Sequence, residues 1–425
     1  MDHIKNDIDG KQPEDWVAWN RLQSIKKHCG ALLWAADDEV ALQISQNRAI
    51  KGLVNNIRAR TKMAKVNHND EELNRITEKF QCPKLHKLSE EWLWDECKNG
   101  SNWKCLARSL RDRHTLLMTV QTCTRHEATL SCMLQGMEFV KHQLQGETEP
   151  CDTLMRNVCK GKTNQENQQT ILQAKSIRHK HAHLCEQGAL AMCLFARFRV
   201  HDEEFDLSDN KKWMQVKTTV SLNNSKQQFE VSRTKKMCEG PFHSKLDTVF
   251  QSFGFNMSHV VHFGRSCSPV LLEFASVVIT AIETLGNWCQ NTCNKSHSLN
   301  LPWEALRAAA GFKKDINFYR NTRSCVKVPS RLKRKVFPNV ERARVLHESL
   351  SEEQQLQAKM GAKFLRVMDH LAEVFVQDVC ELRMTGRDRH LLFTDPFFWI
   401  KISLSTSNFS DKNTLATVIP AMTRP

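Results

Sequence analysis

One apolar stripe near the C-terminal end constrains the fold most strongly. Its members recur three and four residues apart: Phe364, Leu365, Met368, Leu371, Phe375, Val379 and Leu382. A helix with such a stripe must bury it against other apolar surface. The helical period also recurs between residues 15 and 104, and the chain has only 15 Gly and 11 Pro among its 425 residues. These patterns predict a mainly helical protein.

Two short segments depart from the helical period. "MEFVKHQL" and "QTILQAKSI" alternate apolar and polar side chains, and the polar insert "GKTNQENQ" separates them. Such a pattern predicts two or three strands with a hairpin. The expected fold class is therefore mainly α with a small β-sheet (α+β). A second helical block is expected from "CEQGALAMCLFARF" to about residue 318, followed by the basic linker "PSRLKRKVFPNVERARV".

The length of the chain allows two or three domains. We expect a helical N-terminal domain over residues 1–104, a central domain over 105–345 and a C-terminal helical extension over 346–425. The stripe of the C-terminal helix can be buried within the chain or against a second subunit. The sequence leaves both open, so a homodimer is one of the expected states.

Charge and composition narrow the class of partner. A net charge of +14, with 40% hydrophobic and 25% charged residues, indicates a soluble globular protein with an anionic partner, most commonly nucleic acid.

The 16 cysteines are spread out and "MDHIKNDIDGKQPEDW" has no apolar signal segment, so free thiols are expected. The most apolar run, "PVLLEFASVVITAIETLG", is too short and too charged to span a bilayer. It is expected to form one buried helix, and no membrane partner is expected.

Several side chains suited to a DNA phosphate follow one another along the chain. They are Arg125 in "CTRHEA", Lys162 in "KGKTNQ", His262 and Arg265 in an H-x-x-R element, and Trp288 in "LGNWCQ". Planar arginines can bind two phosphate oxygens at once. Strand cleavage would also need an acid for the leaving hydroxyl and a nucleophile.

This series resembles the active-site order of tyrosine recombinases. The stretches "RHKHAHLCEQGALAMCLFARF", "LNLPWEALRAAAGF", "VPSRLKRKVFPNVE" and "LAEVFVQDVCEL" are similar to a domain found in two groups of proteins. These are the DNA-binding subunit of the fungal point-centromere kinetochore complex and the recombinases of Crypton-type transposons. The resemblance covers roughly Leu106 to Phe398.

The resemblance implies a role for each matching residue. Arg125 and Arg265 would clamp the phosphate, and Lys162 would protonate the leaving 5′ oxygen. His262 would assist proton transfer, and Trp288 would donate to a phosphate oxygen.

The position of the nucleophile departs from this pattern. His297 stands where the recombinases have tyrosine, and imidazole is a poor substitute for a phenol in such a site. The single tyrosine, Tyr319, can either reach the site of a neighbouring protomer or pack as an aromatic side chain. The resemblance therefore favours a chain that keeps phosphate contacts and has lost strand cleavage, so enzymatic activity stays open with a leaning toward none.

Other polar clusters carry weaker hypotheses. His179, His181 and His183 beside Cys185, and Cys289, Cys293 and His297, could each collect zinc, but no second paired set stands at zinc-finger spacing. We expect no metal and no cofactor. The basic run Arg331, Lys333, Arg334 and Lys335 suits DNA-backbone contact, nuclear import or a solvated surface.

Three functional hypotheses follow. The first is a nuclear protein that grips double-stranded DNA through retained phosphate-clamp residues. The second is an active Crypton-like recombinase or transposase that uses Tyr319 or His297. The third is a non-catalytic scaffold or transposon relic whose positive charge is incidental.

Overall fold

A computed structural model describes residues 89, 103–142, 151–158, 172–203, 207, 210–224, 229–252, 262–288, 301–313, 321–357, 359–384 and 390–399. The chain divides into two compact units, Met1–Glu78 and Lys79–Pro425, and all described residues belong to the second. The predicted N-terminal domain, residues 1–104, lies almost entirely outside them. The predicted domain boundaries at 104 and 345 stay predictions.

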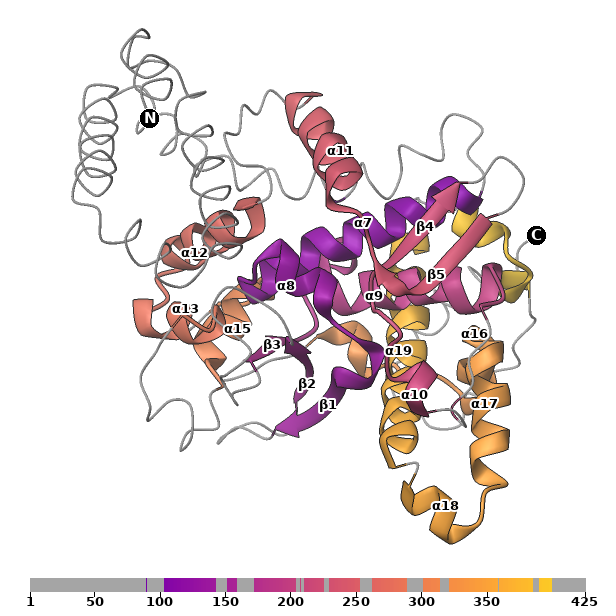
Figure 1. Ribbon diagram of the computed structural model, residues 1–425. Coiled ribbons are helices and arrows are strands. Elements are labelled where there is room, and N and C mark those ends of the chain that lie inside the picture. Colours follow the sequence, from indigo (N-terminus) through magenta and orange to yellow (C-terminus); the bar gives the residue numbers. More distant parts are fainter. Residues whose placement is uncertain are drawn as a thin grey trace, which may run out of the picture. The chain divides into compact units, whose positions relative to one another are not determined.

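The described elements are mostly helices (Figure 1). The helices are α7 (Trp103–Thr122), α8 (His126–Ser131), α9 (Glu186–Phe195), α10 (Asn210–Trp213), α11 (Glu239–Ser252), α12 (Phe263–Phe274), α13 (Ile279–Leu285), α15 (Trp303–Ala309), α16 (Ser330–Val336), α17 (Pro338–Glu348), α18 (Glu352–Gln357) and α19 (Lys359–Met384). The strands are β1 (Met137–His142), β2 (Cys151–Val158), β3 (Leu172–Ser176), β4 (Val220–Asn224) and β5 (Phe229–Lys236). Short turns are η2 (Leu134–Gly136), η3 (Ala182–Leu184), η4 (Ala196–Val200), η6 (Thr322–Cys325), η7 (Leu391–Thr394) and η8 (Pro396–Trp399). The predicted fold class is confirmed.

Helices α7, α9 and α19 form the centre of the second unit. Every residue of α9 is buried, and α7 is buried from Leu106 onward except for Arg108. A helix that is buried on all sides belongs to the interior of a large core. The ring of Phe195 on α9 stacks on that of Phe375 on α19, with centroids 4.3 Å apart.

The structure shows whether the apolar stripe of α19 packs within the chain or is left for a second subunit. All seven stripe residues named above are buried within this chain, most of them in the same core as α7 and α9. The stripe therefore packs internally, because no apolar face of it is left for a second subunit. Homodimerisation through another surface stays a prediction.

The predicted strands form a three-stranded antiparallel sheet in the order β1-β2-β3. Met137 pairs with Arg156 at one end of the first ladder, and Val158 pairs with Leu172 where β2 and β3 leave their hairpin. Glu186, the first residue of α9, accepts hydrogen bonds from Arg156 on β2 and from Ser176 on β3, the latter at 2.8 Å. This buried carboxylate fastens the sheet to the central helices.

A second sheet corrects the prediction that helices and loops alone make up the block to about residue 318. Strands β4 and β5 form an antiparallel hairpin, with Asn224 paired to Phe229 and an irregularity between Val220 and Ser221. The run Thr218–Val220 is β-branched, which favours extended backbone over helix. Polar residues dominate the rest of the hairpin and hid its strand character in the sequence.

The segment predicted to be one buried helix, residues 269–286, is two helices. Between α12 and α13 the backbone of Ser276 takes a left-handed conformation with φ 59°, which ends the first helix. Phe274 and Ile279 beside this break are 59% and 55% exposed. The apolar run was therefore a poor guide to burial at this corner.

The predicted basic linker is also helical. It forms α16 and α17, which meet at Phe337, and Pro338 occupies the first turn of α17. Proline is favoured at that place because its missing N–H needs no partner there. Proline therefore marked a helix start rather than a linker.

Two simpler expectations concern membranes and thiols. No helix among the described residues is long and apolar enough to cross a membrane. The ten cysteines within the described ranges are all free thiols, as predicted for them.

A buried ion network joins α19 to the chain that follows β3. The carboxylate of Asp378 accepts hydrogen bonds from Arg178 and from Arg323, the latter at 2.5 Å, and all three side chains are buried. Arg323 also donates to the backbone oxygens of His179 and Lys180 at 2.6 and 2.7 Å. Burial alone would raise the pKa of Asp378, but the two guanidinium groups outweigh it and the pKa is lowered.

We predict that Asp378→Asn lowers the free energy of unfolding by about 3–5 kcal/mol, because it leaves two buried guanidinium groups without their counter-charge. The measurement is urea unfolding followed by circular dichroism. The matched control is Asp369→Asn on the same helix, whose side chain is 45% exposed and pairs with Arg344; it should cost less than about 1 kcal/mol. Equal losses in the two variants would contradict the assignment.

The same network predicts a pH dependence. A carboxyl group whose pKa is lowered by folding stabilises the protein above its ordinary pKa, and this stabilisation is lost as the pH falls through the lowered value. The difference in unfolding free energy between the wild type and Asp378→Asn should therefore be largest near pH 7 and shrink below about pH 4. A difference that stays constant down to pH 3 would show that Asp378 is not ionised in the folded protein.

Candidate functional site

Arg125 stands on a rigid turn between α7 and α8. Cys123 is fully buried with φ 53°, and the hydroxyls of Thr122 and Thr124 lie 2.9 Å apart. The backbone N–H of Thr129 donates to the oxygen of Arg125 at 3.1 Å, which starts α8. The turn is held by buried side chains, so the half-buried Arg125 is presented from a fixed backbone.

Arg265 comes from the first turn of α12, which packs against α7. A side chain at Gly264 would lie 2.2 Å from Oγ1 of Thr119, so only glycine allows this approach. Ser268 donates to the backbone oxygen of Val120. Because α12 docks at the end of α7 that leads to Arg125, the two arginines are brought into electrostatic contact. His262, which immediately precedes α12, is exposed.

Trp288 lies against Arg265. The guanidinium carbon of Arg265 is 4.7 Å from the centroid of the indole ring, a cation–π contact. Trp288 follows a left-handed residue, Asn287, whose side-chain amide donates to the backbone oxygen of Gln173 on β3 at 3.0 Å. The indole N–H is buried and has no hydrogen-bond partner among the described residues.

The electrostatics of this group favour an anion. Burial lowers the pKa of Arg265, and the neighbouring positive charge of Arg125 lowers it further, to about 10. Arg265 still carries its charge near pH 7, but no described acid pairs with either arginine. Burial raises the pKa of Cys123 to about 12, so its thiol stays neutral beside them. An oxyanion such as a phosphodiester would satisfy both guanidinium groups and the indole N–H.

The other buried arginines show the contrast. Five of them pair with acids: Arg111 with Asp112, Arg156 with Glu186, Arg178 and Arg323 with Asp378, and Arg197 with Glu203. In these pairs the charge is neutralised and the arginine is part of the core. Arg125 and Arg265 have no such acidic partner among the described residues.

Several predicted site residues cannot be placed. Lys162, His297 and Tyr319 lie outside the described residues. The strands that flank Lys162 are described, and Gln173 near the start of β3 touches the turn of Trp288. Thus Arg125, Arg265 and Trp288 are brought together, and β3 contacts the turn of Trp288 through Gln173.

His179, His181 and His183, which the sequence suggested as possible zinc ligands, contact one another. Nδ1 of His179 accepts the backbone N–H of His181 at 3.0 Å, and burial lowers the pKa of His179 to about 3. The rings of His181 and His183 stack with centroids 5.6 Å apart.

The basic run lies on α16, on the opposite side of the core from α12 (Figure 1). Lys333 pairs with Glu373 at 3.2 Å and Arg334 with Glu341 at 3.5 Å. Arg331 and Lys335 have no such acidic partner among the described residues. The run therefore does not join the arginine pair, and half of its charge is neutralised.

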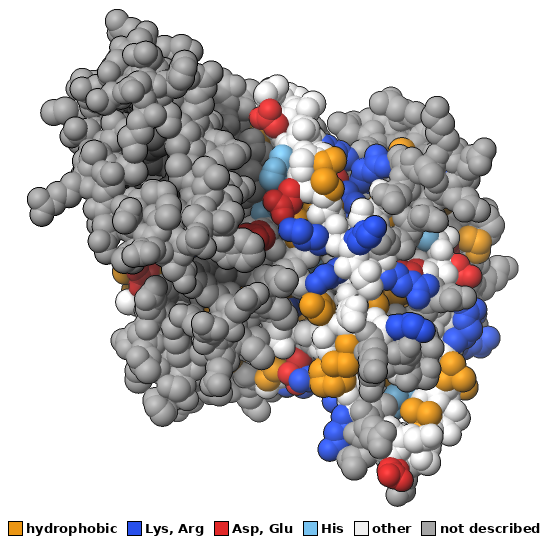
Figure 2. All heavy atoms as spheres, viewed as in Figure 1, with side chains coloured by type: hydrophobic (Ala, Val, Ile, Leu, Met, Phe, Trp, Pro, Cys, Tyr) orange, Lys and Arg blue, Asp and Glu red, His pale blue; other side chains and the backbone are white. Residues whose placement is uncertain are grey.

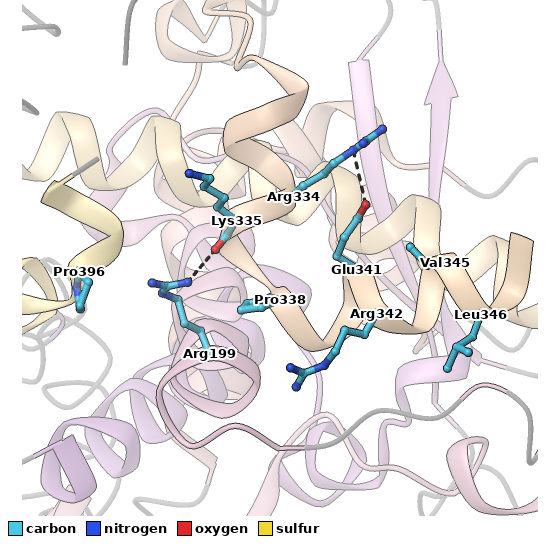
Figure 3. Close-up of a pocket in the computed structure, with 9 residues that line it drawn as sticks. All are labelled: Arg199, Arg334, Lys335, Pro338, Glu341, Arg342, Val345, Leu346 and Pro396. Atoms are coloured by element: carbon cyan, nitrogen blue, oxygen red, sulfur yellow. Dashed lines mark hydrogen bonds and ion pairs between the residues drawn. The ribbon is translucent and has the colours of Figure 1, made fainter. Parts of the chain in front are cut away.

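A hollow of about 800 Å³ adjoins this run (Figure 3). Its lining residues are Arg199, Arg334, Lys335, Pro338, Glu341, Arg342, Val345, Leu346 and Pro396. Arg199 donates to the backbone oxygen of Lys335 at 2.9 Å. Figure 2 shows Lys and Arg side chains spread over the described part of one face rather than gathered in a single patch.

Sequence reasoning missed two features. Lys175 on β3 is buried, which lowers its pKa to about 8, a value suited to proton transfer. No pattern marked it, because alternation alone does not show which face of a strand is buried.

His126, Glu239 and His243 form the second feature: they place one ligand atom each within 4.8 Å of one another. The spacing of Glu239 and His243, four residues apart on a helix, was the available signal.

Residues 58–401 match the family described as the centromere DNA-binding protein complex CBF3 subunit, domain 2. No curated protein matches the chain. Two solved Holliday-junction complexes of Flpe, one of them a mutant, are similar at 11% identity and a TM-score of 0.36 each. The alignments cover 66% and 74% of this chain and 64% and 70% of those chains. The chain thus spans just under two thirds of the first of them.

We predict that Arg125→Gln leaves the urea midpoint of unfolding unchanged or raises it, because it removes a like charge beside Arg265. Arg156→Gln, which strips the buried Glu186 of its partner, should lower the unfolding free energy by about 3–5 kcal/mol. Both are measured by urea unfolding at low ionic strength. A loss of stability in Arg125→Gln comparable to that in Arg156→Gln would make Arg125 a structural residue.

Proposed function

Because the chain belongs to the family of domain 2 of the centromere DNA-binding protein complex CBF3 subunit, we propose that it binds double-stranded DNA and that Arg125 and Arg265 hold a backbone phosphate. One observation carries the proposal. Two half-buried arginines, one from the turn between α7 and α8 and one from α12, stand in electrostatic contact, and no described acid neutralises them. Placing like charges together costs free energy, which a bound phosphate would return.

The neighbours of the pair fit the same role. The buried indole N–H of Trp288 lacks a partner within the described residues and would donate to a phosphate oxygen. The cation–π contact with Trp288 would help to hold the guanidinium of Arg265 in place. Lys162 would approach from the β2–β3 hairpin, which meets the Trp288 turn at Gln173. His262 at the start of α12 would add a further contact from its exposed position.

We propose that this chain grips DNA without cutting it. The resemblance to tyrosine recombinases places His297 at the position of the nucleophile, and an imidazole does not replace a phenol in phosphotyrosine chemistry. The phosphate contacts then serve affinity alone. A nuclear location follows from a centromeric family, and the exposed Arg331 and the partly exposed Lys335 on α16 are suited to a second backbone contact or to nuclear import.

Two other functions are kept as outcomes of the test. An active Crypton-like recombinase would form a covalent bond to DNA through His297 or Tyr319. A scaffold or transposon relic would not bind duplex DNA in a salt-sensitive way. Homodimerisation is compatible with each of the three.

We predict that the full chain binds random-sequence duplex DNA, and that its logarithmic affinity falls linearly with the logarithm of the salt concentration. The double variant Arg125→Gln, Arg265→Gln should reduce the magnitude of this slope by about 1.8, since each phosphate contact contributes about 0.9. The measurement is fluorescence anisotropy at several salt concentrations. The loss of affinity should be similar for unrelated sequences, because phosphate contacts carry no base information.

The control removes the same charge elsewhere. Lys359 and Arg366 are exposed on α19, and Lys359→Gln, Arg366→Gln should leave the slope nearly unchanged. Equal slopes in the two double variants would show that binding follows net charge and not the arginine pair. A denaturing gel after incubation with nicked duplex completes the test, because a covalent adduct would establish strand cleavage.

A further inference from the structure

A histidine follows directly after Arg125 and belongs to a cluster of its own. His126 is the first residue of α8, and Glu239 and His243 lie four residues apart on α11. One ligand atom from each of the three lies within 4.8 Å of the other two. Two imidazoles and a carboxylate from two separate helices therefore converge on one point.

The histidines have unused coordinating capacity. His126 is 4% exposed, and neither of its ring nitrogens has a hydrogen-bond partner among the described residues. Nε2 of His243 is likewise buried and without a partner within that set. A buried imidazole normally satisfies its N–H through a hydrogen bond, since leaving it unmade is costly. Phe242 stacks on the ring of His126 with centroids 4.6 Å apart and 7° between the planes, which fixes the orientation of His126.

We propose that His126, Glu239 and His243 bind a divalent transition-metal ion, with Zn²⁺ as the best fit to the ligand types. Two histidines and one glutamate are a known zinc ligand set that leaves a fourth position open for water. Bonds of about 2.0–2.1 Å around a tetrahedral ion put neighbouring ligand atoms about 3.4 Å apart. The observed separations exceed this by little more than 1 Å at most, so small side-chain rotations suffice. Hard cations such as Mg²⁺ prefer oxygen ligands and fit this site poorly.

The ammonium group of Lys236 is the main competitor of a metal ion at this site. Lys236 donates to Oε1 of Glu239 at 2.9 Å, and this hydrogen bond is the largest cause of the lowered pKa of Glu239. The carboxylate is therefore ionised near pH 7, as a metal ligand must be. A metal ion would compete with the ammonium group of Lys236 for this carboxylate. Burial lowers the pKa of His126 to about 4, so its ring is neutral and free to coordinate.

The ion would connect two elements that otherwise meet through side chains. It would tie α11 to the first residue of α8, one position after Arg125. Bound metal would thus fix the position of α11 beside the arginine pair. The proposal concerns metal binding alone and holds whether or not the chain binds DNA.

The test measures Zn²⁺ affinity of the full chain by competition with a chromophoric chelator, and the visible spectrum of the Co²⁺-loaded protein. We expect one tight site, with a four-coordinate Co²⁺ spectrum that lacks a thiolate band. His243→Ala and Glu239→Gln should each weaken Zn²⁺ binding by about 100-fold. Asp247→Asn, which removes a carboxylate from the same helix, should not change the affinity.

Two further pairs of variants make the test specific. Lys236→Gln should tighten Zn²⁺ binding by about 2- to 5-fold because it removes the competing donor, whereas Lys235→Gln, an equal loss of charge, should not. Cys238 is exposed beside Glu239, so Cys238→Ser tests for capture by a thiol and should leave the affinity unchanged.

Absence of a tight site in the folded wild type would overturn the proposal. So would a tight site that survives both His243→Ala and Glu239→Gln, or one that is lost in Cys238→Ser. Circular dichroism of each variant without metal shows whether it is folded. If His243→Ala does not fold, Glu239→Gln and the Lys236→Gln and Lys235→Gln pair decide the question.

Discussion

The buried carboxylate of Asp378 is the interaction on which the rest of the second unit depends. It lies in the middle of α19 and accepts from Arg178, which follows β3, and from Arg323 in η6. The carboxylate of Asp378 thereby links α19 to two segments far from it in the sequence, the chain after β3 and η6. Arg178 follows β3, and Gln173 on β3 contacts the turn of Trp288. Through β3, the position of α19 therefore constrains the position of Trp288. Close packing supports this, because a side chain at Gly188 of α9 would meet Asp378 at 1.8 Å.

Around this anchor the protein uses arginine in two different ways. In several core pairs a guanidinium group is matched by an acid, as with Arg156 and Glu186, because an unmatched buried charge is expensive. At the ends of α7 and α12 the matching acids are absent from the described residues. Within the described part of the chain, the charges of Arg125 and Arg265 therefore lie close together without an acidic partner. The indole of Trp288 screens one face of the pair without neutralising it.

Much of this could be predicted from the sequence, and the failures have physical causes. The stripe of α19 and strands β1 and β3 followed from periodicity, whereas no pattern had marked β2, which lies between them in the sheet. The series Arg125, Arg265 and Trp288 came from a resemblance, and the structure brings these three together. The β4–β5 hairpin was missed because the apolar alternation of each strand, Val220 with Leu222 and Phe229 with Val231, is short and polar residues follow it. The run from 269 to 286 was misjudged because hydropathy does not reveal a left-handed residue such as Ser276. The cluster around His126 was missed because His126 is more than a hundred residues from Glu239 and His243, whose spacing was the only signal in the sequence.

The contact between Gly264 and Thr119 has a consequence for how such a site can change. Because Gly264 has no side chain, α12 lies so close to Thr119 on α7 that there is no room for even a single Cβ atom between them. Side-chain substitutions elsewhere can alter the charge of the site but have little leverage on its span. The spacing of the proposed phosphate site would therefore depend on how closely the two helices approach each other, and less on which side chains surround it.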